Sequence, residues 1–137
     1  MERVLGFGGV FIRAKDKEGL ARWYRDNLGI NLQEEWSGCL FPLRHPDDAG
    51  GAHSLWSAYS DEPDDSGKTP APYSLGFRVR DLDEMLAQLK ANGNEADDGE
   101  HSEYGDFGHV IDPEGNTIAL WQPPANLPPD WREAVTD

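Results

Sequence analysis

The chain has 137 residues, of which 37% are hydrophobic, and its formal net charge is −14 at pH 7. A surface this acidic repels phosphate backbones and anionic lipids, which argues against nucleic acid or a membrane as a partner. The single cysteine, Cys39, excludes an intrachain disulfide and a thiolate metal cluster. The length suits one domain spanning residues 1–137, and the lack of a recognisable signal peptide predicts a cytoplasmic location.

The first half of the chain begins with a predicted strand at residues 10–16, where apolar and other side chains alternate. Asp16 is a good helix N-cap, and apolar residues follow it at helical spacing. These residues are Leu20, Trp23, Tyr24 and Leu28. Gly29 stands where helices commonly end in the left-handed conformation. Three more strands are predicted, at residues 31–36, 38–43 and 53–59.

The same order recurs in the second half. A predicted strand at residues 75–81 ends in Asp81, and apolar residues at helical spacing precede Gly93. Those apolar residues are Leu82, Met85, Leu86 and Leu89. Weaker strands follow near residues 95–97 and 107–111, and a last one at residues 117–121. Asp, Pro, Gly and Asn at residues 112–116 predict a tight hairpin turn between the last two strands.

The repeated order predicts two modules, each of β-α-β-β-β type. The first module spans about residues 6–60 and the second about residues 73–123. An acidic linker rich in Asp, Pro, Ser and Gly joins them at about residues 61–72. A proline-rich tail at residues 124–137 follows, and we expect Trp131 to dock it on the domain.

Three segments of the chain resemble the vicinal oxygen chelate superfamily, which includes glyoxalases, extradiol dioxygenases and bleomycin-resistance proteins. The segments are residues 23–29, 77–83 and 112–121, and the resemblance extends from about residue 10 to residue 123. It implies an α+β fold in which two tandem βαβββ modules form a curved mixed sheet, a cup, with the helices outside. It also implies a small-molecule ligand inside the cup and a homodimer.

Metal-dependent members of that superfamily carry a His on the first strand of each module and a Glu on the last strand. The equivalent positions in this chain are Gly9, Ser74 and Ala119, and His53 could occupy the fourth. Gly and Ala offer no side-chain ligand, and Ser is a poor ligand for a divalent transition metal. Another conceivable set of ligands is His101, Glu103, Asp106 and His109. Such residues in a surface segment are more often simply solvated, so we expect no metal and no other cofactor.

Strand alternation places one set of side chains on the concave face of the expected cup. We predict that this set binds the ligand: Phe11, Arg13, Arg78, Phe107, His109 and Trp121. Small residues at positions 9, 76 and 119 leave space among them. The two arginines could hold a carboxylate or phosphate, although pairing with nearby Asp or Glu is slightly favoured. The acidic exterior would instead suit a cationic ligand, so the two cues conflict.

The sequence favours binding over catalysis. The leading interpretation is a glyoxalase/bleomycin-resistance-like protein that binds a small organic molecule in an aromatic-lined cup without a metal. The alternative is a lyase or isomerase of glyoxalase type (lactoylglutathione-lyase-like), with a non-standard metal site or with His109 and Glu103 or Tyr104 as acid–base groups. Tyr104 is also expected to act as a lid contact in a rim loop at residues 103–105. A third possibility is a non-catalytic structural or regulatory domain.

Overall fold

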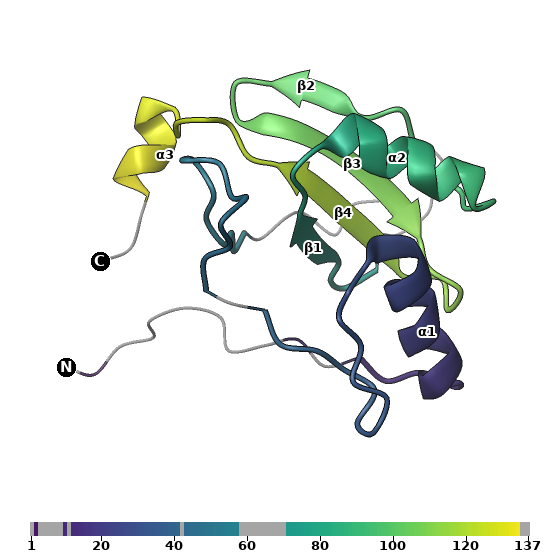
Figure 1. Cartoon of the computed structure of the whole chain (residues 1–137). Helices are drawn as coiled ribbons and strands as arrows, with labels where there is room; N and C mark the ends of the chain where they lie inside the picture. The colour runs from purple at the N-terminus through teal and green to yellow at the C-terminus, as the bar shows by residue number, and fades with distance from the viewer. Residues whose placement is uncertain (1, 3–9, 11, 42, 58–70, 135–137) are drawn as a thin grey trace.

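The computed structural model describes residues 2, 10, 12–41, 43–57 and 71–134 (Figure 1). Its elements, in chain order, are α1 (Lys17–Leu28), β1 (Leu75–Arg78), α2 (Leu82–Ala91), β2 (Glu100–Ser102), β3 (Gly105–Ile111), β4 (Thr117–Gln122) and α3 (Pro129–Glu133). Helices packed on a sheet make the fold α+β, as the sequence predicts. Gly9, Phe11 and most of the expected linker lie outside the described residues.

The four strands form one curved sheet in the order β1-β4-β3-β2 (Figure 1). β1 runs parallel to β4, whereas β3 is antiparallel to both of its neighbours. The β3–β4 register pairs His109 with Ala119 and Ile111 with Thr117. The predicted hairpin is therefore confirmed. Its turn is closed by Gly115, whose φ of 84° favours glycine.

Both of the predicted amphipathic helices form, and their caps are the predicted ones. Asp16 Oδ1 accepts a hydrogen bond from the Gly19 backbone N–H at 3.0 Å, and Gly29 ends α1 with a φ of 71°. Asp81 Oδ1 accepts from the Glu84 backbone N–H at 3.0 Å, and left-handed Gly93 follows the last residues of α2. Capping and apolar spacing are local signals, which is why they are readable in the sequence.

The core lies between the two long helices and one face of the sheet. Its fully buried members are Leu82, Leu89, Val110, Ile118 and Leu120. Helix α1 adds Leu20 and Tyr24 to this core. The Tyr24 hydroxyl donates to Asp112 Oδ2 at 2.9 Å, and this buried hydrogen bond ties α1 to the β3–β4 turn. No long helix among the described residues covers the opposite face of the sheet, which is called the open face below (Figure 1).

The first half of the chain differs from its prediction. Residues 10–16, 31–36, 38–43 and 53–57 form no strand where the structure describes them, apart from an isolated bridge between Gln33 and Gly38. A strand exists only through hydrogen bonds to a neighbour, and alternation within one segment does not supply that neighbour. Residues 58–59, the end of the strand expected at residues 53–59, lie outside the described residues.

The second half needs two smaller corrections. Residues 95–97 contribute only an isolated bridge, between Ala96 and Val110, and not a full strand. Strand β2 was not predicted, because its residues are polar and exposed and lack the apolar alternation that marks a strand. β3 begins at Gly105, so the expected rim loop at residues 103–105 is shortened to a turn at residues 103–104.

The C-terminal tail docks on the domain through Trp131, as expected. The Trp131 ring lies 4.7 Å from that of Tyr104 and 6.1 Å from that of Trp121, measured between centroids. The loop at residues 45–53 is fastened to the same tail, because the Gly51 backbone N–H donates to the Pro124 carbonyl oxygen at 3.0 Å. Within the described residues, no helix combines the length and the apolar character needed to cross a bilayer.

Candidate functional site

The open face carries the predicted ligand-binding residues that lie on the described strands. Gly76 pairs with Ala119 across β1 and β4, and Arg78 pairs with Trp121. On the other side of β4, Trp121 pairs with Phe107 and Ala119 with His109. Residues that pair in this way share a face, so the structure brings these four predicted side chains together: Arg78, Phe107, His109 and Trp121. Their role in binding stays a prediction.

Aromatic side chains from β3, β4 and α3 form a continuous cluster, which we call the aromatic wall. Its members are Tyr104, Phe107, Trp121 and Trp131. The Phe107 and Trp121 rings stack with centroids 6.0 Å apart and planes 18° apart. Trp121 Nε1–H donates to the Tyr104 carbonyl oxygen at 2.8 Å, which fixes the orientation of the indole. Gly105 makes this approach possible, since a Cβ there would collide with the Gln122 carbonyl oxygen.

Tyr104 belongs to the aromatic wall and is not free above an opening. Its hydroxyl donates to Asp130 Oδ2 at 2.7 Å, and that hydrogen bond is the main reason that the pKa of Tyr104 is raised to about 12. Its ring packs against Trp131 at the same time. A phenol held in this way is a poor proton donor at neutral pH, which weakens the acid–base role that the sequence leaves open for it.

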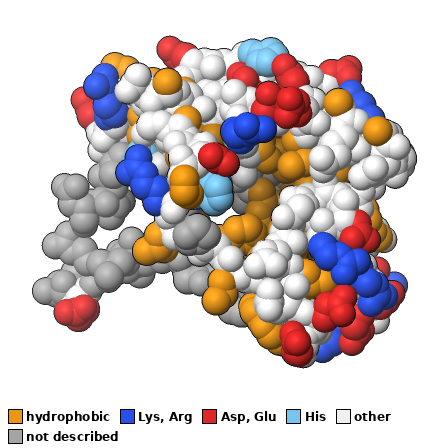
Figure 2. Space-filling model, in the orientation of Figure 1, with side chains coloured by type: hydrophobic (Ala, Val, Ile, Leu, Met, Phe, Trp, Pro, Cys, Tyr) orange, Lys and Arg blue, Asp and Glu red, His pale blue; other side chains and the backbone are white. Residues whose placement is uncertain are grey.

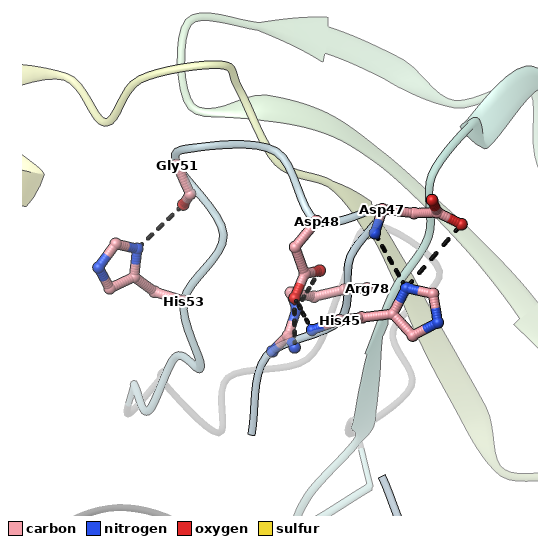
Figure 3. Close-up of polar contacts among 6 residues, drawn as sticks. All are labelled: His45, Asp47, Asp48, Gly51, His53 and Arg78. Carbon is pink, nitrogen blue, oxygen red and sulfur yellow. Dashed lines mark hydrogen bonds and ion pairs between the residues drawn. The ribbon is translucent and has the colours of Figure 1, made fainter. Parts of the chain in front are cut away.

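Arg78 is held by a carboxylate from the loop at residues 45–53 (Figure 3). Its Nε donates to Asp48 Oδ1 at 3.1 Å and its Nη2 to Oδ2 at 3.2 Å. Asp48 also accepts the His45 backbone N–H at 3.0 Å. Desolvation acts to raise the pKa of Asp48, but the hydrogen bonds from Arg78 and His45 outweigh it and leave the pKa below its usual value. For the two arginines the sequence slightly favours pairing with a nearby Asp or Glu over binding a ligand. The ion pair between Arg78 and Asp48 is of this kind, and it fastens the 45–53 loop to β1.

Arg13, the second predicted arginine, lies on the exposed segment before α1. The prediction of a duplicated strand requires Arg13 and Arg78 to share one face of a sheet. Residues 12–16 form no strand, so strand pairing does not bring Arg13 beside Arg78. Phe11, the third predicted aromatic side chain of the cup, lies outside the described residues.

His109 pairs with Asp97, a residue that the sequence did not single out. His109 Nδ1 lies 2.9 Å from Asp97 Oδ2, and the His109 backbone N–H donates to Asp97 Oδ1 at 3.0 Å. Desolvation acts to raise the pKa of Asp97, but hydrogen bonds from His109 and Gly99 hold it below its usual value. The weak strand predicted at residues 95–97 was the only signal for this contact, because it placed Asp97 near β3. Among the described residues, Glu103 and Tyr104 make no hydrogen bond to His109.

A hollow of about 320 Å³ lies beside the His109–Asp97 pair. It is lined by Glu95, Ala96, Asp97, His109, Val110 and Ile111. Both side chains of the pair are about half exposed, at 52% and 48%. An imidazole whose Nδ1 is held by a carboxylate keeps Nε2 available to a solute, so the pair could exchange a proton with a molecule in this hollow.

The residues described do not fit the metal site of the superfamily. No group of three or more His, Cys, Asp or Glu side chains is placed to bind an ion in this part of the chain. Ala119 on β4 presents only a methyl group, and His53 sits in the 45–53 loop with Nδ1 3.1 Å from the Gly51 carbonyl oxygen. His101 pairs with Asp106 at 3.0 Å, and alternation along β3 puts Asp106 and His109 on opposite faces.

A second hollow, of about 300 Å³, lies between the 45–53 loop and the tail. It is lined by Gly50, His53, Asn126, Leu127 and Arg132. In the orientation of Figure 1, the space-filling view shows hydrophobic side chains in a recess near the middle of the molecule, with charged groups around it (Figure 2). The described part of the chain is thus hollowed in more than one place.

Fold and site together define a class of protein: an α+β domain whose two long helices cover one face of a curved sheet and whose other face carries the candidate site. The family model described as the Glyoxalase/Bleomycin resistance protein/Dioxygenase superfamily matches residues 6–120, and the chain belongs to this superfamily. No curated protein matches the chain significantly.

The solved structures similar to this chain include two from Streptomyces sp. CB03234. One is TnmS3, an antibiotic binding protein from Streptomyces sp. CB03234, with a TM-score of 0.54, 18% identity and coverage of 90% of this chain and 100% of that chain. The other is a glyoxalase/bleomycin resistance protein from the same Streptomyces, with a TM-score of 0.49, 19% identity and coverage of 81% and 95%. At such identities the first likeness shows the fold alone, and the second carries no argument.

Proposed function

We propose that this protein binds a small organic molecule against the open face of its sheet, in an aromatic-lined cup. The observation that carries the proposal is the Phe107–Trp121 stack beside the small residues Gly76 and Ala119. Aromatic side chains offer a large apolar contact area, and missing side chains leave room for a flat ligand. Membership of a superfamily that includes bleomycin-resistance proteins, and similarity to an antibiotic binding protein, support the proposal.

The ligand of this face is neutral or cationic and has an aromatic or otherwise flat body. The inward arginines are the cue for an anionic ligand, and the acidic exterior is the cue for a cationic one. The first cue loses weight because the Arg78 guanidinium already binds Asp48. The net charge of −14 attracts cations to the surface, and indole faces favour them further. An anionic aromatic compound would instead have to displace the Asp48 carboxylate.

Gly76 offers the sharpest test of this binding face. A Cβ added at Gly76 meets nothing within 4 Å, so Gly76→Val is expected to fold while it fills the open face. A panel of neutral, cationic and anionic aromatic compounds, antibiotics included, is screened by thermal shift, and each hit is titrated by calorimetry. We expect Gly76→Val to weaken binding at least about tenfold. The matched control is Ala87→Val on the exposed side of α2, which should bind like the wild type.

Two outcomes count against the binding proposal. One is the failure of every compound to raise the melting temperature at concentrations far above a plausible Kd. The other is equal binding by Gly76→Val and the wild type.

We propose that binding at this face needs no metal. The support is chemical: the superfamily's ligand positions are held here by Gly9, Ser74 and Ala119, which supply no good donor for a transition metal. Elemental analysis of protein purified without chelators should find much less than one Zn, Ni, Mn or Fe per chain. Stoichiometric metal would overturn this part of the proposal.

A second candidate function is metal-free acid–base catalysis, as in a lyase or isomerase of glyoxalase type. The observation that favours it is the His109–Asp97 pair at 2.9 Å beside a hollow of about 320 Å³. Turnover of hemithioacetal or related carbonyl substrates would be lost in His109→Gln and reduced in Asp97→Asn. His101→Gln, which removes an imidazole that pairs with Asp106, is the matched control.

We also propose that the chain forms a homodimer. Several large apolar residues of the first half are strongly exposed, among them Leu40, Phe41, Leu43 and Trp56. Exposed apolar side chains that gather into one patch mark association surfaces, and three of these residues lie within four positions of one another. Sedimentation velocity should give the mass of two chains for the wild type, and Leu43→Asp should shift the protein toward the monomer. A wild-type protein that sediments as a monomer at high concentration would contradict this proposal.

A further inference from the structure

The hollow between the 45–53 loop and the tail differs in chemistry from the rest of this acidic molecule. Three of its five lining residues carry side-chain N–H groups: His53, Asn126 and Arg132. None carries a carboxylate, although the chain contains 26 Asp and Glu residues. We infer that this hollow binds a small oxyanion, namely a carboxylate or phosphate group. The inference goes beyond the proposed function, because none of these residues belongs to the aromatic wall.

The carboxylates nearest in sequence are engaged elsewhere. On the loop, Asp48 binds Arg78, and Asp47 Oδ2 lies 3.9 Å from His45 Nδ1 (Figure 3). On α3, Asp130 accepts the Tyr104 hydroxyl at 2.7 Å. None of these three carboxylates lines the hollow. Glu133 is exposed and does not line the hollow.

Three donor-bearing side chains line the same hollow. The Arg132 guanidinium offers a planar fork that matches two oxygens of a carboxylate or phosphate, and it is always charged. Asn126 adds an amide N–H. His53 Nδ1 contacts the Gly51 carbonyl oxygen at 3.1 Å, which leaves Nε2 on the far side of the ring (Figure 3). A protonated His53 would therefore donate to Gly51 and to the anion together.

The walls of the hollow are joined by backbone contacts, so the site does not depend on side chains alone. The Gly51 N–H donates to the Pro124 carbonyl oxygen at 3.0 Å and connects the loop to the tail. Gly51 is buried, and a Cβ there would collide with that same oxygen. Leu127, buried as well, adds an apolar side chain to the lining of the hollow.

The test is a titration of the full ¹⁵N-labelled chain with inorganic phosphate, and separately with acetate, at constant ionic strength. We expect saturable shifts of the Asn126 side-chain amide and of the Arg132 Nε–H for at least one anion. Tighter binding of phosphate would assign the hollow to a phosphate-bearing ligand, and tighter binding of acetate to a carboxylate. Arg132→Gln should weaken the binding about tenfold or more, and His53→Gln should weaken it less.

The control variant is Arg22→Gln, which removes the same charge from an exposed position of α1. It should change the Kd by no more than about twofold, because a distant surface charge is screened by salt. Absence of saturable shifts with both anions would overturn the inference. Equal weakening by Arg22→Gln and Arg132→Gln would also overturn it, since the effect would then be one of net charge. A folded spectrum for each variant separates lost binding from lost structure.

Discussion

The two halves of the chain carry the same local signals, yet only the second builds a sheet within the described residues. In the second half, Ile118 and Leu120 are completely buried under the helices. In the first half, Leu43 is 98% exposed and Trp56 78% exposed. A repeat of strand pattern, capping Asp and amphipathic helix therefore does not ensure equal packing.

The difference between the halves follows from what each element needs. A helix satisfies its own backbone, so α1 and α2 form wherever a cap and an apolar stripe coincide. A strand must find its partner, and the partners of β1, β3 and β4 all lie in the second half. The first half contributes α1 to the common core through Leu20 and Tyr24. Ile12 and Ala14 from its strand-like segments pack against this core only partly buried, while Leu43 and Trp56 stay exposed.

The largest expected effect comes from the buried side of this comparison. Leu120→Ala removes a fully buried side chain from the centre of the sheet and leaves a cavity. We expect a loss of about 2–5 kcal/mol in the free energy of unfolding, measured by urea denaturation. Leu40→Ala, at an 87% exposed position of the first half, is the matched control and should change stability little. Equal losses would mean that the two halves pack alike in solution.

The sequence predicted the helices and the hairpin well because their signals are local. Asp16, Asp81, Gly29 and the turn at residues 112–116 act on residues within a few positions, and each does what its chemistry requires. The shared face of Phe107, His109 and Trp121 also followed, since alternation fixes it once the hairpin is known.

The contacts that sequence reasoning missed join distant parts of the chain. Asp48 meets Arg78, and Tyr24 meets Asp112, across long separations that no spacing rule encodes. Asp97 meets His109 through a short, polar segment without strand-like alternation. The first-half strands were wrong in the described residues for the opposite reason, because alternation was present and a pairing neighbour was not.

A second way to sharpen the comparison is to cut one of the hydrogen bonds that join the halves, the buried one between Tyr24 and Asp112. Tyr24→Phe removes the donor to Asp112 Oδ2 and leaves that buried carboxylate with fewer partners. We expect a loss of about 1–3 kcal/mol in the free energy of unfolding. Tyr104→Phe, which removes a hydroxyl from an exposed hydrogen bond, is the control and should cost less.

The buried hydroxyl of Tyr24 also predicts how the free energy of unfolding depends on alkaline pH. Burial, together with the hydrogen bond to Asp112, raises the pKa of Tyr24 above its ordinary value. The neutral phenol is thus favoured by folding, so its contribution is complete below about pH 10 and is lost as the pH rises above that value. Unfolding free energies measured from pH 8 to 11 should fall less steeply for Tyr24→Phe than for the wild type. Identical slopes would contradict the prediction.

A smaller effect is expected where the first half touches the open face. Asp48→Asn breaks the charged contact with Arg78, and we expect a loss of about 1 kcal/mol at pH 7. Because the pKa of Asp48 is lowered, its contribution is present above about pH 4 and is lost as the pH falls below that value. Denaturation midpoints from pH 7 to 3 should therefore fall less in Asp48→Asn. Asp83→Asn, on an exposed position of α2, is the control.

The smallest expected effect on stability tests the exposed side directly. Leu43 is 98% exposed, so Leu43→Ala removes almost no buried surface from the chain and should change the unfolding free energy by less than about 0.5 kcal/mol. The measurement is made at low protein concentration, where a dimer would dissociate, and repeated at high concentration. A loss that appears only at high concentration would mean that a second copy buries Leu43, because association stabilises by mass action. A loss of the same size at both concentrations would contradict the contrast between the halves, since it would require Leu43 to be buried within its own chain.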